Sequence, residues 1–338
     1  MMFSRALILG ATGMIGCHAV HACLRRGLGV RALARPGSNT SILEGLDVEV
    51  ARGDLGDLPS LGAAFAGCDL VVHAAAPYPR RHYGKAALLR AADAGMSHWL
   101  AAAKASDRLR RLVYVSSATT IGRPEPVAAP RPARESDTTP IDDSTPYFSL
   151  KAMLESRARA AAEAGLPLVI VNPTFCVDEY DDHRTTAQLL LPLARGMLPA
   201  YIPGLLNAVP TRDVGEGILL AAERGRSGER YILGGENTTS GEFLDRCARV
   251  SGAKPPRVAL PVGPAEAISR ATELLALLTG TRPLFPLTGV RMIKHGQHYD
   301  TTKAASELGY SPTALDEAIR RAYAWYRRRG FLPPSERS

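Results

Sequence analysis

The sequence has few aromatic residues, no closely spaced pair of cysteines and no long apolar run. Phe, Tyr and Trp make up 6% of the 338 residues, too few for the aromatic platforms on which proteins stack nucleic-acid bases. The five cysteines lack CxxC or metal-site spacing, which favours reduced thiols in a cytoplasmic protein. No apolar stretch reaches the roughly 18 residues that a membrane span needs, and the first residues do not resemble a signal peptide.

The chain has more basic than acidic residues. The formal net charge is +8, and only six of the 41 basic residues are lysine. The arginines are scattered along the chain, as on the solvated faces of an ordinary globular protein, so we expect no nucleic-acid partner. A basic surface still favours anionic substrates or peripheral contact with an anionic membrane.

Short apolar runs alternate with longer helical patterns through the first half of the chain. The runs are continuous, which is typical of strands that are buried on both faces of a parallel sheet. This alternation predicts an α/β fold with a doubly wound parallel sheet. The expected strands are 6–9, 29–34, 48–51, 70–75, 112–115, 168–171 and 230–233, and the expected helices are 14–26, 58–66, 88–105 and 147–164.

Residues 10–16, GATGMIG, directly follow the first expected strand and open the first expected helix. Glycines here permit a tight turn and close backbone approach, and a helix N-terminus offers N–H groups to a diphosphate. A glycine-rich turn alone is a weak signal, but its place at the first strand–helix junction predicts a dinucleotide site. The expected contacts are Gly10, Thr12, Gly13, Met14, Ile15 and Gly16.

The ends of the following strands offer further cofactor contacts. Arg35 stands where NAD enzymes often carry an acidic residue, so it could meet a 2′-phosphate, or be a plain surface arginine. We expect NADP, with NAD left open. Asp54, followed by Leu55, could accept a hydrogen bond from adenine or cap the next helix. The cofactor could lie close over the backbone of Ala74, Ala75 and Ala76. Its carboxamide could be held by Asn172, Pro173 and Thr174.

Tyr147 and Lys151 carry the predicted chemistry. Their i,i+4 spacing at the start of a helix places both side chains on one face. A phenol has a pKa near 10, and a neighbouring ammonium favours the phenolate and lowers that pKa towards the working range. Tyr147 can then exchange a proton with an alcohol or ketone. Ser117, at the end of another strand, is expected to hold the substrate oxygen, with Thr119 beside it; serines that merely close the strand are the alternative.

Other polar residues give weaker signals. The loop after the fourth strand contains Tyr78, Arg80 and Arg81, which could contact an anionic group of the substrate or form a solvated basic loop. His73 lies inside a strand and is expected to be packed. His18 and His21 share a helix face but have no third ligand in sight, so we expect no metal site.

The pattern loosens after residue 174, where Pro and Leu become frequent. Helical patterns dominate beyond residue 235. We expect residues 1–174 and 211–235 to form the dinucleotide-binding domain, and 175–210 and 236–312 a smaller, discontinuous, mainly helical substrate lobe. Residues 313–330 should form a C-terminal helix. The lobe should rest over the carboxyl ends of the strands, where ligands of such sheets bind.

Together, the segments GATGMIG, GDL, YVSSATTIG, YFSLK and VNPT resemble an extended short-chain dehydrogenase/reductase. The resemblance covers nearly the whole chain and is closest to the hopanoid-associated sugar epimerases, which are similar to dihydroflavonol reductases and 3β-hydroxysteroid dehydrogenases. It implies a catalytic triad of Ser117, Tyr147 and Lys151, and an NADP phosphate at Arg35. Ala118-Thr119 replaces the acidic pair of sugar-nucleotide dehydratases, which argues against dehydration. Ile121 replaces a tyrosine of many sugar-nucleotide epimerases.

Two reactions fit these residues. A dehydrogenase or reductase would interconvert a secondary alcohol and a ketone on a sterol or another polycyclic, lipid-like substrate, and 3-oxidation beside a carboxylate would lead to decarboxylation. A nucleotide-sugar epimerase is the alternative. The apolar stripe of residues 265–278 is expected to pack in the core, with a pocket wall or a membrane-facing helix as the alternatives. We expect a monomer or homodimer.

Overall fold

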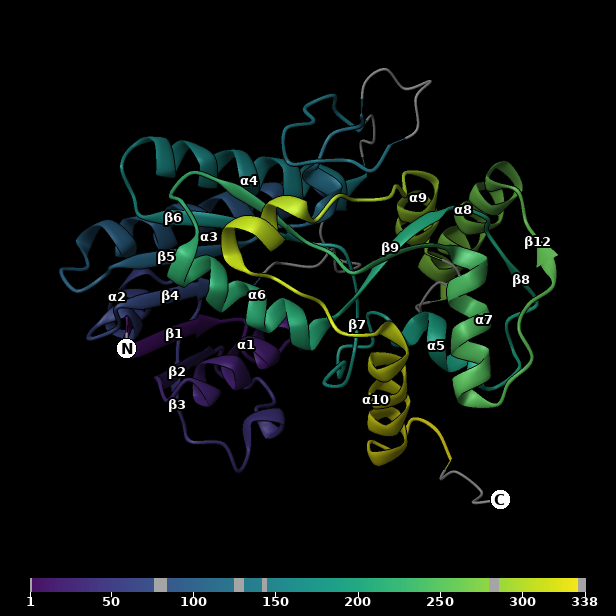
Figure 1. Cartoon of the computed structure of the whole chain (residues 1–338), viewed down its shortest axis with the longest axis horizontal. Coiled ribbons are helices and arrows are strands. Elements are labelled where there is room, and N and C mark those ends of the chain that lie inside the picture. The colour runs from purple at the N-terminus through teal and green to yellow at the C-terminus, as the bar shows by residue number, and fades with distance from the viewer. Residues whose placement is uncertain (1, 76–83, 125–130, 142–144, 280–285, 334–338) are drawn as a thin grey trace.

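The computed structural model describes residues 2–75, 84–124, 131–141, 145–279 and 286–333. Its main feature is a seven-stranded sheet with the order β10-β6-β5-β4-β1-β2-β3, in which every neighbouring pair is parallel (Figure 1). The strands are β1 (Arg5–Leu9), β2 (Gly29–Ala34), β3 (Val48–Arg52), β4 (Leu70–His73), β5 (Arg111–Val115), β6 (Leu168–Pro173) and β10 (Arg230–Leu233). This confirms the predicted doubly wound parallel sheet.

Helices cover both faces of this sheet. Alternate residues of β1 show why its sequence is apolar throughout: Ala6 and Ile8 face one buried cluster, and Leu7 and Leu9 face the other. The helices on the first side are α1 (Met14–Arg25) and α6 (Thr211–Arg224), and those on the second are α2 (Leu58–Phe65), α3 (Lys85–Ala105) and α4 (Pro146–Glu163). Burial on both sides makes the sheet a rigid base whose strand ends carry the predicted site.

A second, three-stranded sheet with the order β11-β9-β7 lies beside the first (Figure 1). The sequence did not predict it: residues 175–210 and 236–312 were expected to form a mainly helical lobe. These strands are short and pair with distant segments, and β11 has the polar sequence ENTT. The bounds are β7 (Phe175–Val177), β9 (Leu205–Pro210) and β11 (Glu236–Thr239), and a separate pair joins β8 (Ala200–Tyr201) to β12 (Val258–Ala259).

The remaining helices accompany this second sheet (Figure 1). They are α5 (Ala187–Ala194), α7 (Ser240–Ser251), α8 (Val262–Thr279), α9 (Leu287–Lys294) and α10 (Leu315–Arg328), and α10 lies within the expected C-terminal helix. The division into a dinucleotide-binding domain and a substrate lobe stays a prediction. In the described part of the chain, none of the helices has the length and apolar character needed to cross a membrane.

Candidate active site

The turn after β1 depends on glycine. Gly10 has φ +85°, in the left-handed region, and a Cβ there would lie 2.7 Å from the amide nitrogen of Ala75. A Cβ on Gly16 would collide with the carbonyl oxygen of Gly10. By contrast, a Cβ on Gly13 would lie 3.4 Å from that oxygen, an ordinary contact. Gly10 and Gly16 are therefore required by the fold, whereas Gly13 is not.

The N-terminus of α1 has no side-chain cap. Gly13 is its capping residue and supplies no side chain, while Thr12, Met14 and Ile15 are partly exposed. The first N–H groups of the helix are thus available to an anion. This uncapped helix start, beside a turn that only glycine can form, fits the diphosphate of a dinucleotide.

Arg35 follows β2 and is exposed. The structure adds a second arginine that sequence reasoning missed: Arg52 ends β3, in register with Ala34, and its Nη1 donates to the carbonyl oxygen of Arg35 at 3.3 Å. The Arg52 side chain therefore reaches the backbone of Arg35 at this corner of the sheet. Asp54 does not cap α2, because its Oδ1 accepts from the amide of Gly56 at 2.7 Å and the capping position belongs to the next aspartate.

The predicted catalytic side chains come together at the carboxyl ends of β5 and β6. The Tyr147 hydroxyl lies 3.4 Å from the Ser117 Oγ, and the Lys151 Nζ donates to the Ser116 carbonyl oxygen at 3.2 Å. Thr119 donates to the same Ser117 Oγ, from its amide at 3.2 Å and from its hydroxyl at 3.0 Å. Ser117, Tyr147 and Lys151 are each less than 9% exposed. The three predicted side chains thus occupy one site that is nearly closed to water.

The pKa values of this site differ from the expectation. Burial raises the pKa of Tyr147, and the contact with Ser117 opposes that rise only in part. Burial also lowers the pKa of Lys151 to about 8, against the opposing charge of Glu155. The phenol pKa is therefore raised where the sequence predicted a lowered one, because loss of hydration outweighs the hydrogen bond with Ser117.

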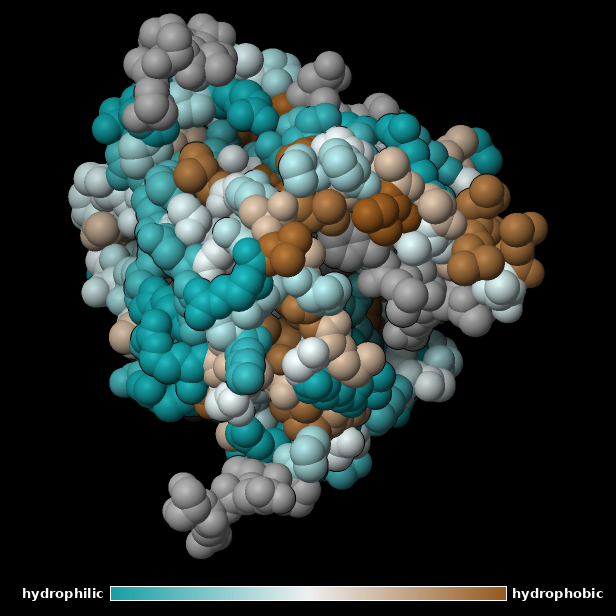
Figure 2. All heavy atoms as spheres, turned by 90° about the vertical axis from the view of Figure 1, so that its right-hand side faces the viewer, coloured by the Kyte–Doolittle hydropathy of each residue, from teal (hydrophilic) through white to brown (hydrophobic). Residues whose placement is uncertain are grey.

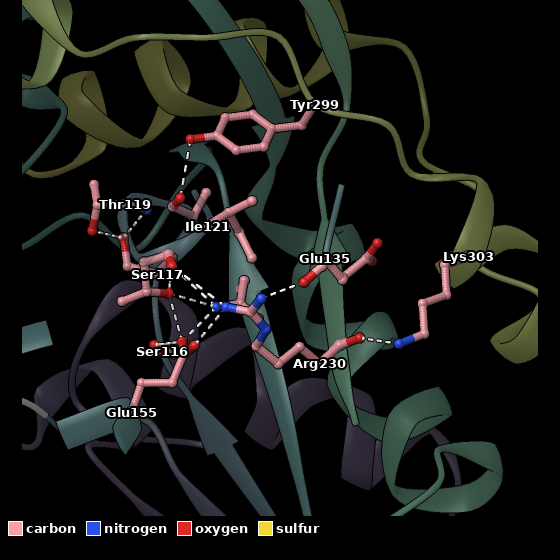
Figure 3. A network of polar contacts seen from close by, with 12 residues as sticks. Ser116, Ser117, Thr119, Ile121, Glu135, Glu155, Arg230, Tyr299 and Lys303 are labelled. Atoms are coloured by element: carbon pink, nitrogen blue, oxygen red, sulfur yellow. Dashed lines mark hydrogen bonds and ion pairs between the residues drawn. The ribbon is translucent and has the colours of Figure 1, made fainter. Parts of the chain in front are cut away.

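A buried carboxylate supports the site from below (Figure 3). Glu155 stands one turn after Lys151 on α4 and is 3% exposed. Its Oε2 accepts hydrogen bonds from Ser116 Oγ at 2.5 Å, Thr120 Oγ1 at 2.5 Å and Asn172 Nδ2 at 2.7 Å. It therefore ties the residues before and after Ser117 to the helix that carries Tyr147 and Lys151.

Arg230, on β10, neutralises this carboxylate. Its Nη1 lies 3.1 Å from the Glu155 Oε1, and both side chains are at most 10% exposed. Arg230 also donates to the carbonyl oxygen of Glu135, whose own carboxylate accepts from the amide of Ile232 at 2.8 Å (Figure 3). Sequence reasoning missed this pair, although the four-residue steps from Tyr147 to Lys151 to Glu155 place all three on one face of α4.

The other predicted contacts are arranged as follows. Asn172 turns its amide into the Glu155 network and also donates to the Ser117 carbonyl oxygen at 3.1 Å. Pro173 ends β6, and the Thr174 hydroxyl donates to Asn207 at 2.7 Å.

Ala74 and Ala75 lie against Gly10, and the Leu55 carbonyl oxygen lies 3.1 Å from the His98 Nδ1. Four predicted residues lie outside the described part of the chain: Ala76, Tyr78, Arg80 and Arg81.

The three histidines that the sequence singled out pack against aromatic rings. His73 is 4% exposed between the rings of Trp99 and Tyr114, and burial lowers its pKa to about 3. His18 and His21 both pack against the ring of Tyr180. Among the described residues, no group of three or more His, Cys, Asp or Glu side chains is arranged to hold a metal ion.

Comparison with protein families places this site in a known context. The model of the NAD dependent epimerase/dehydratase family matches residues 6–234, from β1 to the glycine that follows β10. The chain belongs to this family. It is an extended short-chain dehydrogenase/reductase, as the resemblance predicted, and hence an NAD(P)-dependent oxidoreductase.

The relatives of this chain are named for different substrates. The chain is 33% identical to sterol demethylase protein B of Methylococcus capsulatus, over 96% of this chain and 99% of the relative. It is 30% identical to the 4-hydroxy-2-methyl-3-oxo-4-farnesyl-3,4-dihydroquinoline-1-oxide ketoreductase of Stigmatella aurantiaca, over 91% and 92%. The crystal structure of a nucleoside-diphosphate-sugar epimerase from Pseudomonas aeruginosa superimposes with a TM-score of 0.80 at 29% identity, over 97% and 99%.

Proposed function

We propose that this enzyme interconverts a secondary alcohol and a ketone on a hydrophobic, sterol-like or other polycyclic lipid substrate. The arrangement of Ser117, Tyr147 and Lys151 in one buried site carries the reaction type. Tyr147 gives its phenolic proton to the ketone oxygen, or takes a proton from the alcohol, and the Lys151 ammonium stabilises the phenolate. Ser117 holds the substrate oxygen. The bound nicotinamide cofactor supplies or accepts the hydride.

The cofactor that we propose is NADP. Its diphosphate would lie on the glycine turn and the start of α1, and its 2′-phosphate between Arg35 and Arg52. Replacing Arg35 by Ala should weaken NADPH binding by roughly 10- to 100-fold, as expected for a charge-assisted contact, and leave NADH binding unchanged. Titration of cofactor fluorescence measures both. Equal losses for the two cofactors would contradict the assignment.

The names of two relatives support a hydrophobic substrate. One is named for a sterol and the other for a farnesyl-bearing ketone, and both match nearly the whole chain. If the substrate carries a carboxylate on the carbon next to the one that is oxidised, the resulting β-keto carboxylate loses CO₂. The electrons of the broken C–C bond form an enolate, which takes up a proton to give the ketone.

The second candidate is a nucleotide-sugar epimerase, which the 29% identical structure from Pseudomonas aeruginosa favours. A reductase releases its oxidised cofactor at each turnover, whereas an epimerase retains it. Incubation with NADPH and a sterol ketone should therefore lower the absorbance of the reduced nicotinamide, and UDP-sugars should not. Inversion of a UDP-sugar without net cofactor consumption, and no reaction with the ketone, would overturn the proposal.

A further inference from the structure

Helix α8 leaves four leucines uncovered near its C-terminal end. Leu274, Leu275, Leu277 and Leu278 are 58–78% exposed. The sequence stripe was expected to pack in the core, and that expectation is wrong for these residues. Figure 2 shows apolar side chains gathered on the face of the molecule that carries α8. Contiguous apolar surface of this kind on a folded protein marks an interaction site.

The inner face of α8 is already satisfied without the leucines. Its buried residues are the small Ala265, Ser269 and Ala276. Ala265 packs with Ile202 and with Val290 of α9. Since the fold is closed on this side by small residues, the leucines on the outer side contribute no core packing.

The charged side chains of α8 also differ between its inner and outer sides. Its carboxylates are used within the protein: Glu266 pairs with Arg291 at 3.2 Å and Lys294 at 3.1 Å, and Glu273 accepts from the amide of Leu287 at 2.9 Å. Arg270 is 64% exposed and lies four residues before Leu274, on the same face. Its Nη2 also lies 3.7 Å from the Glu266 Oε2, so this one carboxylate, which is 14% exposed, is shared among three cations. The outer face therefore combines leucines with a cation, on a chain of net charge +8.

We propose that the outer face of α8 docks on an anionic phospholipid surface. An apolar helix face with basic and no acidic groups is the pattern of a helix that lies in the membrane interface, with its leucines among the acyl chains and its arginine at the headgroups. A protein partner of ordinary composition would not require this absence of outward carboxylates. The proposal does not depend on the substrate class proposed above.

The docking face is connected to the active site. Helix α8 packs against α9. The residue that follows α9 is His295, whose ring lies 5.6 Å from that of Phe148. Phe148 is the neighbour of Tyr147. Docking would therefore place the part of the molecule that borders the catalytic helix at the membrane surface, where a lipid-like substrate resides.

Co-sedimentation with lipid vesicles tests the proposal on the full chain. The native protein should bind vesicles of phosphatidylcholine mixed with phosphatidylglycerol, and bind phosphatidylcholine alone more weakly. The triple variant Leu274→Gln, Leu277→Gln, Leu278→Gln should partition about tenfold or more weakly, because it loses the inserted apolar area. Since these side chains are exposed, its melting temperature should match that of the native protein. Arg270→Gln should reduce only the preference for the anionic vesicles.

A matched control replaces two exposed apolar residues on the far side of the large sheet, Val50→Gln and Leu58→Gln, and should bind vesicles like the native protein. Equal binding by the triple variant and the native protein, or no binding by either, would overturn the proposal. So would a native dimer in lipid-free buffer that the triple variant converts to a monomer, since a second copy would then cover the leucines. Activity on a detergent-solubilised ketone should persist in the triple variant, which separates this test from that of the proposed reaction.

Discussion

Two regions of the molecule depart from the usual distribution of residues, in opposite directions. One is the polar network of Glu155 and Arg230 below the catalytic side chains, and the other is the outer face of α8. In the network, Glu155 and Arg230 are charged and buried. On α8, four leucines are exposed while small residues fill the inner side. Buried charges and exposed apolar patches both lower stability or solubility unless something compensates for them.

The compensation differs between the two regions. Glu155 is neutralised by Arg230 and hydrogen-bonded to three groups within the chain, so its charge is compensated inside the protein. The α8 leucines have no such internal compensation and call for an external one. The buried charges therefore indicate internal support for the catalytic side chains, whereas the exposed leucines indicate a docking surface. The predictions below test the first region, and the vesicle experiment tests the second.

The largest effect is expected for the side chain at the centre of the chemistry. Tyr147→Phe should lower kcat by about 10²- to 10⁴-fold, the contribution of a positioned proton donor. Cofactor binding, measured by fluorescence titration, should be retained because the glycine turn is untouched. An unchanged kcat would remove Tyr147 from the mechanism.

Next in size is the loss of the buried ion pair. Glu155→Gln should lower the free energy of unfolding by about 3–5 kcal/mol, because it leaves Arg230 buried without its anion. Denaturant titration measures this, and the double variant Glu155→Gln, Arg230→Met should recover much of the loss. As a control, Asp93→Asn breaks the exposed pair with Arg157 and should cost about 1 kcal/mol or less. Equal costs for the two single variants would show that burial does not matter here.

Two glycines of the turn differ in what they are needed for, Gly16 for folding and Gly13 for cofactor binding. Gly16→Ala should lower the free energy of unfolding by about 1–3 kcal/mol, because the new Cβ must displace backbone. Gly13→Ala has room for its methyl group, so the protein without cofactor should melt at nearly the native temperature, while dinucleotide binding should weaken. Thermal melts with and without cofactor measure both. A larger loss of stability for Gly13→Ala than for Gly16→Ala would contradict this geometry.

The smallest effect concerns pH. Lys151 has a pKa lowered to about 8 by burial, so its ammonium is present below that pH and is lost as the pH rises through it. Ketone reduction should therefore slow on that alkaline limb. In Glu155→Gln the opposing charge is gone, the pKa of Lys151 falls further, and the limb should move to lower pH. A profile of kcat/KM against pH that stays in place or moves upward would exclude Glu155 as a positioning residue for Lys151.

The sequence predicted the large sheet well because its central strands are apolar on both faces, whereas the edge strand β3 is partly polar and exposed. It also placed Ser117, Tyr147 and Lys151 in one site, since strand ends and a four-residue helical step fix their positions. It missed β11 because a short polar strand has no periodic signal, and its partner β9 lies elsewhere in the chain.

The supporting network and α8 show two further limits. Glu155 and Arg230 are 75 residues apart, and no local pattern reveals that they meet. For α8, apolar periodicity describes a helix face but not what lies against it, so the same stripe fits a buried core and an exposed docking surface. Only the packing of Ala265, Ser269 and Ala276 on the opposite side shows which of the two is present.

The fate of the transferred hydride tests the central claim most directly. The native protein is incubated with a sterol ketone and NADPH that carries deuterium at the reactive ring carbon, and the product is examined by mass spectrometry. The native protein should form an alcohol with one deuterium on the new carbinol carbon, and Tyr147→Phe should form this product at least about 100-fold more slowly. Unlabelled ketone with the native protein, together with inversion of a UDP-sugar that acquires no deuterium, would contradict it.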